Sequence, residues 1–174
     1  FRPFQSLYFK GGEKGQVHVK LMKDTFTVLG EATGRRGLFN VDLFEGKAQV
    51  KDNEYALEFP WQDAFGKSPE VESWVFSQDG RDRLPDGRGT LKVHAGAPGG
   101  TPGAGQAMDP PPGAPPGPPP GGSHGAVMED PNEPNIVDGK DFESLAIEAH
   151  GNVVRVRIRT YGQWAFRPFQ SLYF

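Results

Sequence analysis

The stretch LFNVDLFEGKAQVKDNEYALEF, residues 38–59, alternates apolar and polar side chains around two turn signals. Turns at Glu45-Gly46 and Asp52-Asn53 would gather the apolar residues on one face and the charged residues on the other. The facing pairs would be Leu43 with Ala48, Val41 with Val50, Val50 with Tyr55, and Ala48 with Leu57. Because two independent turns give one apolar face, the stretch predicts a three-stranded antiparallel meander.

The segments on either side carry the same strand pattern. Residues 17–28 predict a hairpin that turns at Lys23-Asp24, and residues 143–160 predict one that turns at Gly151-Asn152. Further strands are expected over 5–10, 72–78 and 90–95, with a short helix over 61–65. The sequence therefore predicts an all-β protein, an antiparallel sandwich or barrel of about 8–10 strands.

A long Gly/Pro-rich insertion interrupts the last strands. Residues 95–125 contain ten Gly and ten Pro in 31 positions. Such a composition cannot form a packed core. The spacing of Gly113, Gly117 and Gly121 excludes collagen, which needs Gly at every third position. We expect a polyproline-II-like surface insertion.

The first nine residues, FRPFQSLYF at 1–9, are repeated letter for letter at 166–174. A repeat of fixed spacing is typical of linked structural units. We therefore interpret 1–165 as one β-domain repeat unit and 166–174 as the start of the next. Matched terminal strands, or a peptide added to both ends, would give the same duplication. The side chains expected to be buried at the subunit junction are Phe1, Phe4, Leu7, Tyr8, Phe9, Phe166, Phe169, Leu172, Tyr173 and Phe174.

Composition limits the partners of this chain. A net charge of −3 on 174 residues does not favour nucleic acid. The absence of cysteine excludes a disulfide framework and thiolate metal sites. No apolar run is long enough to span a membrane. We expect no enzyme, because no catalytic or phosphate-binding motif is present and the four histidines are scattered, as outer-face strand or loop residues would be.

Two sets of residues remain as ligand-site candidates, although we expect no cofactor. Calcium is the one candidate ion, because acidic loops supply the oxygen ligands it prefers. Neither loop fits the twelve-residue calcium pattern, and Asp-Gly is also ordinary turn chemistry. The loop residues are Asp79, Asp82 and Asp86 in one loop, and Asp130, Asn132, Asp138 and Asp141 in the other. The aromatic residues that could stack on a sugar are Trp61, Trp74, Tyr161 and Trp164.

Two functions follow from these features. The first is a structural repeat of an extracellular or cell-surface filament, in which copies join head-to-tail and the duplicated aromatic segment completes a sheet as an added strand. The second is a carbohydrate-binding β-sandwich module, for which exposed, coplanar tryptophans in a groove would be required.

Overall fold

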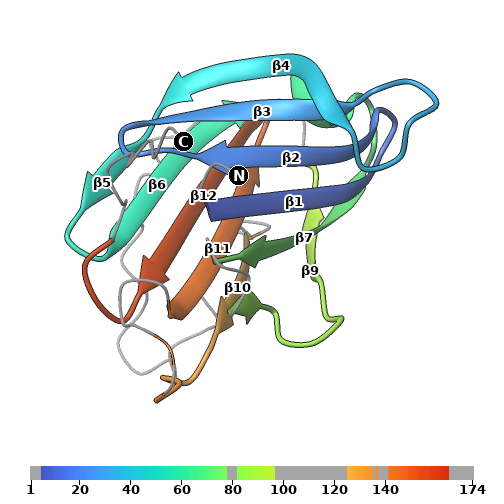
Figure 1. Cartoon of the computed structure of the whole chain (residues 1–174). Coiled ribbons are helices and arrows are strands. Elements are labelled where there is room, and N and C mark those ends of the chain that lie inside the picture. Colours follow the sequence, from blue (N-terminus) through green and yellow to red (C-terminus); the bar gives the residue numbers. More distant parts are fainter. Residues whose placement is uncertain (1–4, 78–81, 97–124, 135, 137–140, 165–174) are drawn as a thin grey trace, which may run out of the picture.

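A computed structural model gives the architecture of this chain; it describes residues 5–77, 82–96, 125–134, 136 and 141–164. Within these residues, twelve strands form two antiparallel sheets that pack face to face as a β-sandwich (Figure 1). The predicted all-β fold class is therefore confirmed. The core of the Gly/Pro-rich insertion, 97–124, lies outside the described residues, so its predicted conformation is not addressed.

The first sheet has seven strands in the order β4-β3-β2-β1-β7-β8, and β9 also pairs with β7. In Figure 1 its first four strands lie side by side in blue to cyan. Its strands are β1 (Gln5–Gly12), β2 (Gly15–Leu21), β3 (Thr25–Glu31), β4 (Phe39–Lys47), β7 (Glu70–Phe76), β8 (Arg83–Leu84) and β9 (Leu91–His94).

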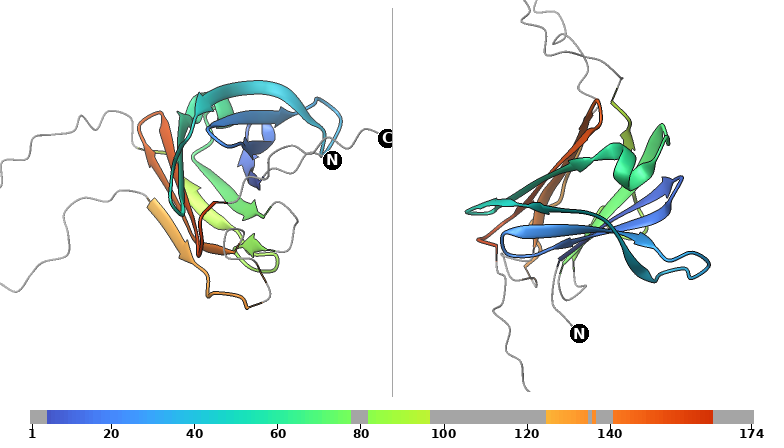
Figure 2. Two further views of the ribbon diagram at one scale, coloured as in Figure 1. Left: turned by 60° about the vertical axis from the view of Figure 1, so that its left-hand side comes forward. Right: turned by 90° about the horizontal axis from the view of Figure 1, so that it is seen from above.

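The second sheet has five strands in the order β10-β11-β12-β6-β5. A one-turn helix, α1 (Trp61–Phe65), leads from β6 in this sheet to β7 in the other, and Figure 2 shows it at one end of the sandwich. It is the only helix among the described residues, none of which form a helix able to cross a membrane. The strands are β5 (Gln49–Lys51), β6 (Glu54–Pro60), β10 (Gly125–Glu129), β11 (Phe142–His150) and β12 (Val153–Thr160).

Both predicted hairpins form in the predicted register. Leu21 pairs with Phe26 across β2 and β3, and Leu145 pairs with Ile158 across β11 and β12. Gly151 adopts φ +56°, the left-handed conformation that its two-residue turn requires. The inward-facing residues of both hairpins are buried in the shared core, as the alternation predicts.

The predicted meander is half right. The turn at Asp52-Asn53 forms, and Val50 pairs with Tyr55. The turn at Glu45-Gly46 does not form: β4 runs through it and pairs with β3, and the chain crosses to the second sheet at Ala48. The predicted pairs of Val41 with Val50 and of Leu43 with Ala48 are therefore wrong, and Val41 is 43% exposed.

A β-bulge explains why β4 prefers β3. The register shifts between Val28 and Leu29, so that Phe44 lies opposite Val28 on the core side. There the ring of Phe44 packs 5.9 Å from that of Phe26. A strict alternation from residue 38 to 44 would have turned Phe44 to the solvent side with Asp42.

Two further strands, β8 and β10, were not predicted from the sequence pattern. β8 has only two residues, and β10 is an edge strand whose residues are exposed or half-buried. Neither carries a run of alternating apolar residues that a sequence could reveal. They raise the strand number above the expected 8–10.

We call the end of the sandwich where β1 begins the proximal end. Here Gln5 pairs with Leu21, and the Tyr55 hydroxyl bonds the Met22 and Thr25 carbonyls at 2.9 and 2.8 Å. The ring of Trp164, the last described residue, lies 5.2 Å from that of Tyr55. Trp164 therefore lies at the end of the sandwich where β1 starts. At the opposite, distal end, the insertion follows Gly96, which lies against Gly151.

Candidate functional site

The candidate site is the position of β1 itself, between β2 and β7, which we call the β1 slot. β1 pairs antiparallel with both neighbours, so it is an interior strand and not a sheet edge. Leu7 and Phe9 point into the core and are fully buried. The ring of Phe9 packs 4.9 Å from that of Phe65 and 5.9 Å from that of Phe59. The inner face of the slot therefore accepts two large apolar side chains.

The outer face of the slot is equally specific. Tyr8 lies between His18 on β2 and Trp74 on β7, its cross-strand neighbours on either side. Its ring stacks on His18 at 4.6 Å and 7°, and on Trp74 at 5.6 Å and 11°. Ser73 adds a hydrogen bond from its hydroxyl to the Tyr8 carbonyl at 3.0 Å. Stacked aromatic pairs contribute beyond the area they bury.

These three rings belong to a larger group that we call the outer aromatic cluster: Tyr8, His18, Phe39, Trp74 and Phe76. Phe39 meets both Tyr8 and His18 edge-on, and Phe76 meets Tyr8 edge-on. The Arg83 guanidinium covers one side, 5.5 Å from the Phe76 ring centre. Cations over aromatic faces are attracted by the ring quadrupole. The sequence does not predict this cluster, because its members come from four strands that are separated along the chain.

His18 is the buried polar centre of this cluster. It lies on the outer face of β2, as expected for a strand histidine, but it is only 6% exposed. Its Nε2 is 3.0 Å from the Ser6 hydroxyl oxygen, a hydrogen bond within the same slot. Burial, with a smaller contribution from the positive charge of Lys20, lowers the pKa of His18 from 6.5 to about 4. The imidazole is therefore neutral at physiological pH.

The predicted junction residues divide into two groups. Leu7 and Phe9 are core residues of their own domain, and Tyr8 belongs to the outer aromatic cluster. Phe1, Phe4 and the whole second copy, 166–174, lie outside the described residues. Their role at a junction stays a prediction.

The predicted sugar-stacking residues do not form one platform. Trp61 is buried against Phe65 and donates its indole N–H to the Ser68 carbonyl at 3.1 Å. Trp164 is 9% exposed and packs on Tyr55. Trp74 lies in the outer aromatic cluster, and Tyr161 is at the surface. Two of the four rings are thus covered by protein and cannot present a face to a ligand.

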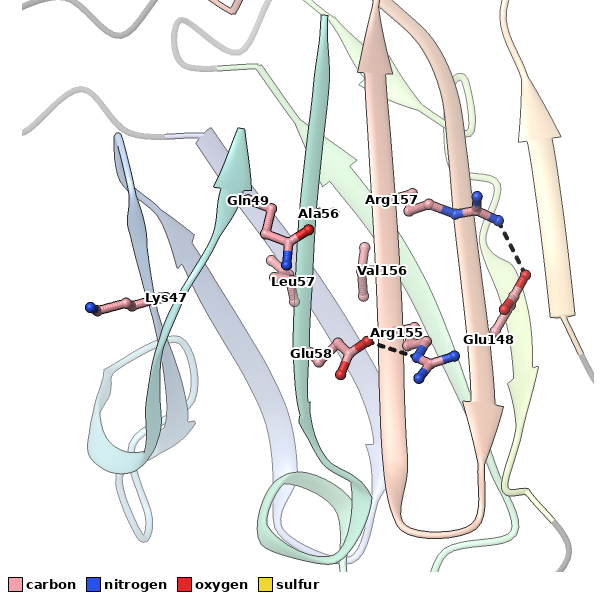
Figure 3. A pocket seen from close by; sticks show the side chains of 9 residues that line it. All are labelled: Lys47, Gln49, Ala56, Leu57, Glu58, Glu148, Arg155, Val156 and Arg157. Carbon is pink, nitrogen blue, oxygen red and sulfur yellow. Dashed lines mark hydrogen bonds and ion pairs between the residues drawn. The ribbon is translucent and has the colours of Figure 1, made fainter. Parts of the chain in front are cut away.

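The outer face of the second sheet carries a charged hollow of about 410 Å³ (Figure 3). Two ion pairs cross it: Arg155 with Glu58 at 2.7 Å, and Arg157 with Glu148 at 3.3 Å. Both pairs are exposed, so they contribute little to stability. The row of Arg155, Arg157 and Arg159 is thus a solvated outer face whose charges are balanced by neighbouring glutamates.

The candidate calcium residues are brought together only in part. Asp82, from one predicted loop, lies with Asp130 and Asp141, from the other, in a buried group at the proximal end. Asp86 and Asn132 are exposed. Asp79 and Asp138 lie outside the described residues.

Comparisons with protein-family models, with curated proteins and with solved structures found no match to this chain.

Proposed function

We propose that this chain is a unit of an extracellular structural filament, in which identical β-sandwich domains are joined head-to-tail through the duplicated segment. One observation carries the proposal: the second copy repeats the first five of the eight residues of β1, which include Leu7, Tyr8 and Phe9. Residues 170–174 are Gln-Ser-Leu-Tyr-Phe, as are residues 5–9. A leucine and a phenylalanine would fill the core side, and a serine and a tyrosine would meet His18 and Trp74 on the outer side.

The position of Trp164 supports this assignment. Residue 170 follows it by six positions, a span of about 20 Å when fully extended. Because Trp164 and the start of β1 lie at the same proximal end, a second copy leaving this end would enter a β1 slot in the direction that β1 runs. The segment therefore needs no long connection to begin a neighbouring domain.

The interior position of β1 restricts how the joint forms. The β1 slot has no free edge to which the second copy could add as an extra strand, because β2 and β7 already flank β1. The second copy must begin a further domain in the same polypeptide or replace β1 in a sister chain. Both arrangements give an open head-to-tail assembly, which propagates as a fibre.

The test uses Leu7→Asp, which places a charge at a fully buried position and excludes the first copy from the slot. We expect this variant to stay folded by circular dichroism, because the intact second copy of another chain fills the slot. It should also self-associate into chains that lengthen with concentration in light scattering and negative-stain microscopy. Leu172→Asp is the matched control and should behave as the unaltered chain.

Two results would contradict the proposal. The double variant Leu7→Asp/Leu172→Asp should fail to fold, so a Leu7→Asp chain that is equally unfolded would show that the second copy cannot serve as β1. A folded Leu7→Asp chain that stays monomeric at every concentration would show that the second copy closes on its own domain, which excludes a head-to-tail joint. The exterior location is tested separately, by protease treatment of intact cells.

A further inference from the structure

Three buried carboxyl groups meet at the proximal end, where the edges of the two sheets come together. Asp82 directly precedes β8 in the seven-stranded sheet, whereas Asp130 follows β10 and Asp141 precedes β11 in the five-stranded sheet. They are 2%, 5% and 0% exposed. Carboxylates are rarely buried to this degree unless they are paired or bind a metal.

Backbone groups hold two of the three carboxylates, and they anchor the main chain of the third residue. Phe142 N–H donates to Asp82 Oδ2 at 2.6 Å, and Glu133 N–H donates to Asp141 Oδ2 at 2.8 Å. Asp130 is anchored through its main chain, whose N–H donates to the Glu143 carbonyl at 3.0 Å. The side chains are therefore fixed by the fold and not by a positive partner.

One oxygen of each carboxylate is left without a partner. These atoms are Asp82 Oδ1, Asp130 Oδ2 and Asp141 Oδ1, all buried. Among the described residues, no ion pair reaches any of the three. Buried polar atoms are almost always satisfied, so three unpartnered oxygens in one place point to a bound ligand.

A fourth carboxylate completes the group. One carboxylate oxygen from each of Asp82, Asp130 and Glu133 lies within 4.8 Å of the other two. Glu133 is half-buried, in the loop between β10 and β11. An ion placed among these atoms would contact oxygens from both sheets.

The electrostatics agree with this geometry. Burial, together with the repulsion of neighbouring carboxylates, raises the pKa of Asp82 and of Asp130 from 3.8 to about 6. A cation in contact with these oxygens would remove that repulsion.

We propose that Asp82, Asp130 and Glu133 bind a calcium ion, with Asp141 supplying a further carboxylate beside it. The ligand atoms are all oxygens, which favours a hard divalent cation over zinc or copper. Calcium tolerates an irregular set of six to eight oxygens, whereas magnesium demands octahedral geometry. The ion joins β8 of one sheet to the β10–β11 loop of the other.

The site is also hydrogen-bonded to Tyr161, which follows the last strand, β12. The Tyr161 hydroxyl donates to the Asp130 carbonyl, and Tyr161 N–H donates to the Asp141 carbonyl at 3.0 Å. Tyr161 lies three residues before Trp164. Calcium would therefore stiffen the segment around Tyr161 at the proximal end, a role that goes beyond the strand joint and does not depend on it.

The experiment uses the full chain after treatment with a chelator. We expect calorimetry to show saturable binding of calcium. For a site with a Kd of about 10⁻⁴ M, as in extracellular modules, about 5 mM calcium should raise the melting midpoint by about 5 to 9 °C. Magnesium at the same concentration should have a much smaller effect.

Variants separate this site from general ionic effects. Asp82→Asn should abolish the calcium response and raise the melting midpoint of the chelated protein, because it removes a buried charge from the group. Glu133→Gln, at a half-buried position, should weaken binding without disturbing the fold. Asp42→Asn, an exposed acid on β4, is the control and should respond as the unaltered chain does.

Three outcomes would overturn the proposal. The first is an unchanged melting midpoint and no heat of binding on calcium addition. The second is a full calcium response in both Asp82→Asn and Glu133→Gln. The third, equal stabilisation by magnesium, would overturn the assignment to calcium.

Discussion

Acid should destabilise this protein through His18. The imidazole is 6% exposed, stacks on Tyr8, and shares a hydrogen bond with the Ser6 hydroxyl. The positive charge of Lys20, on the same strand, also opposes protonation. His18 meets the ring of Tyr8 on β1 and the ring of Phe39 on β4. Its cross-strand partner on β3 is the apolar Leu29. Protonation of His18 would therefore place a cation in a site that is covered by these rings.

The size of the effect follows from the two pKa values. The pKa of His18 is about 4 in the folded state and 6.5 in the unfolded chain, so between these values the unfolded state binds more protons. Stability contributed by neutral His18 is complete above pH 6.5 and is lost as the pH falls toward 4. Since a tenfold change in proton affinity corresponds to about 1.4 kcal/mol, the loss at pH 4 should be about 3 kcal/mol.

The buried aspartates act in the opposite direction and must be separated from His18. The pKa of Asp82 and of Asp130 is raised from 3.8 to about 6, so without a bound cation the folded state binds more protons than the unfolded state between these pH values. Their protonation stabilises the fold as the pH falls. The measured pH dependence of the unaltered chain is the sum of both effects.

The assay compares the unaltered chain with His18→Phe, which keeps an aromatic ring in the stack and removes the titration. Urea unfolding, followed by tryptophan fluorescence, gives the free energy of unfolding of both proteins near neutral pH and at pH 4. Between these values the unaltered chain should lose about 3 kcal/mol more than the variant. An equal loss in both proteins, within about 1 kcal/mol, would refute the reasoning.

Two further substitutions test the packing. Gly46→Ala should lower the free energy of unfolding by about 1–3 kcal/mol in urea titrations, because its Cβ would lie 2.7 Å from Cε1 and Cζ of the buried Phe26 ring. The exposed neighbour variant Glu45→Ala should change the free energy of unfolding by less than about 0.5 kcal/mol. Equal effects of the two variants would contradict this packing. Arg155→Ala should lower the free energy of unfolding by less than about 1 kcal/mol, because the ion pair of Arg155 with Glu58 is exposed. A larger loss of stability that persists in high salt would contradict a solvated outer face.

Local pattern was sufficient to predict the hairpins. A two-residue turn with suitable chemistry fixes the register, and an apolar face that must be buried excludes a slip by one residue. This is why the pairs Leu21–Phe26, Val50–Tyr55 and Leu145–Ile158 match the structure. The short helix at 61–65 was predicted on a different ground, as part of an irregular segment between two strands, and it forms over Trp61–Phe65.

The same rules failed where the strand partner is distant in sequence. Between residues 38 and 51 the alternation is equally compatible with a turn at Gly46 and with a strand that runs past it. The choice was made by Phe44, which reaches the core only when β4 pairs with β3 across a bulge. The adjacent apolar residues Leu43 and Phe44 break the alternation, and both pack against the core. That break does not identify β3 as the partner strand, so the pairing could not be predicted from the sequence.

The sequence by itself determined the fold class, the register of each hairpin and the identity of the two copies of the duplicated segment, because these depend on neighbouring residues or on the letters alone. Only the tertiary structure decided that β1 is an interior strand, that His18 is buried between Tyr8 and Phe39, and that Asp82 meets Asp130 and Asp141. These features join residues that are far apart along the chain. Burial and the loss of solvation depend on which side chains lie close together in space, and the order of residues along the chain does not show this.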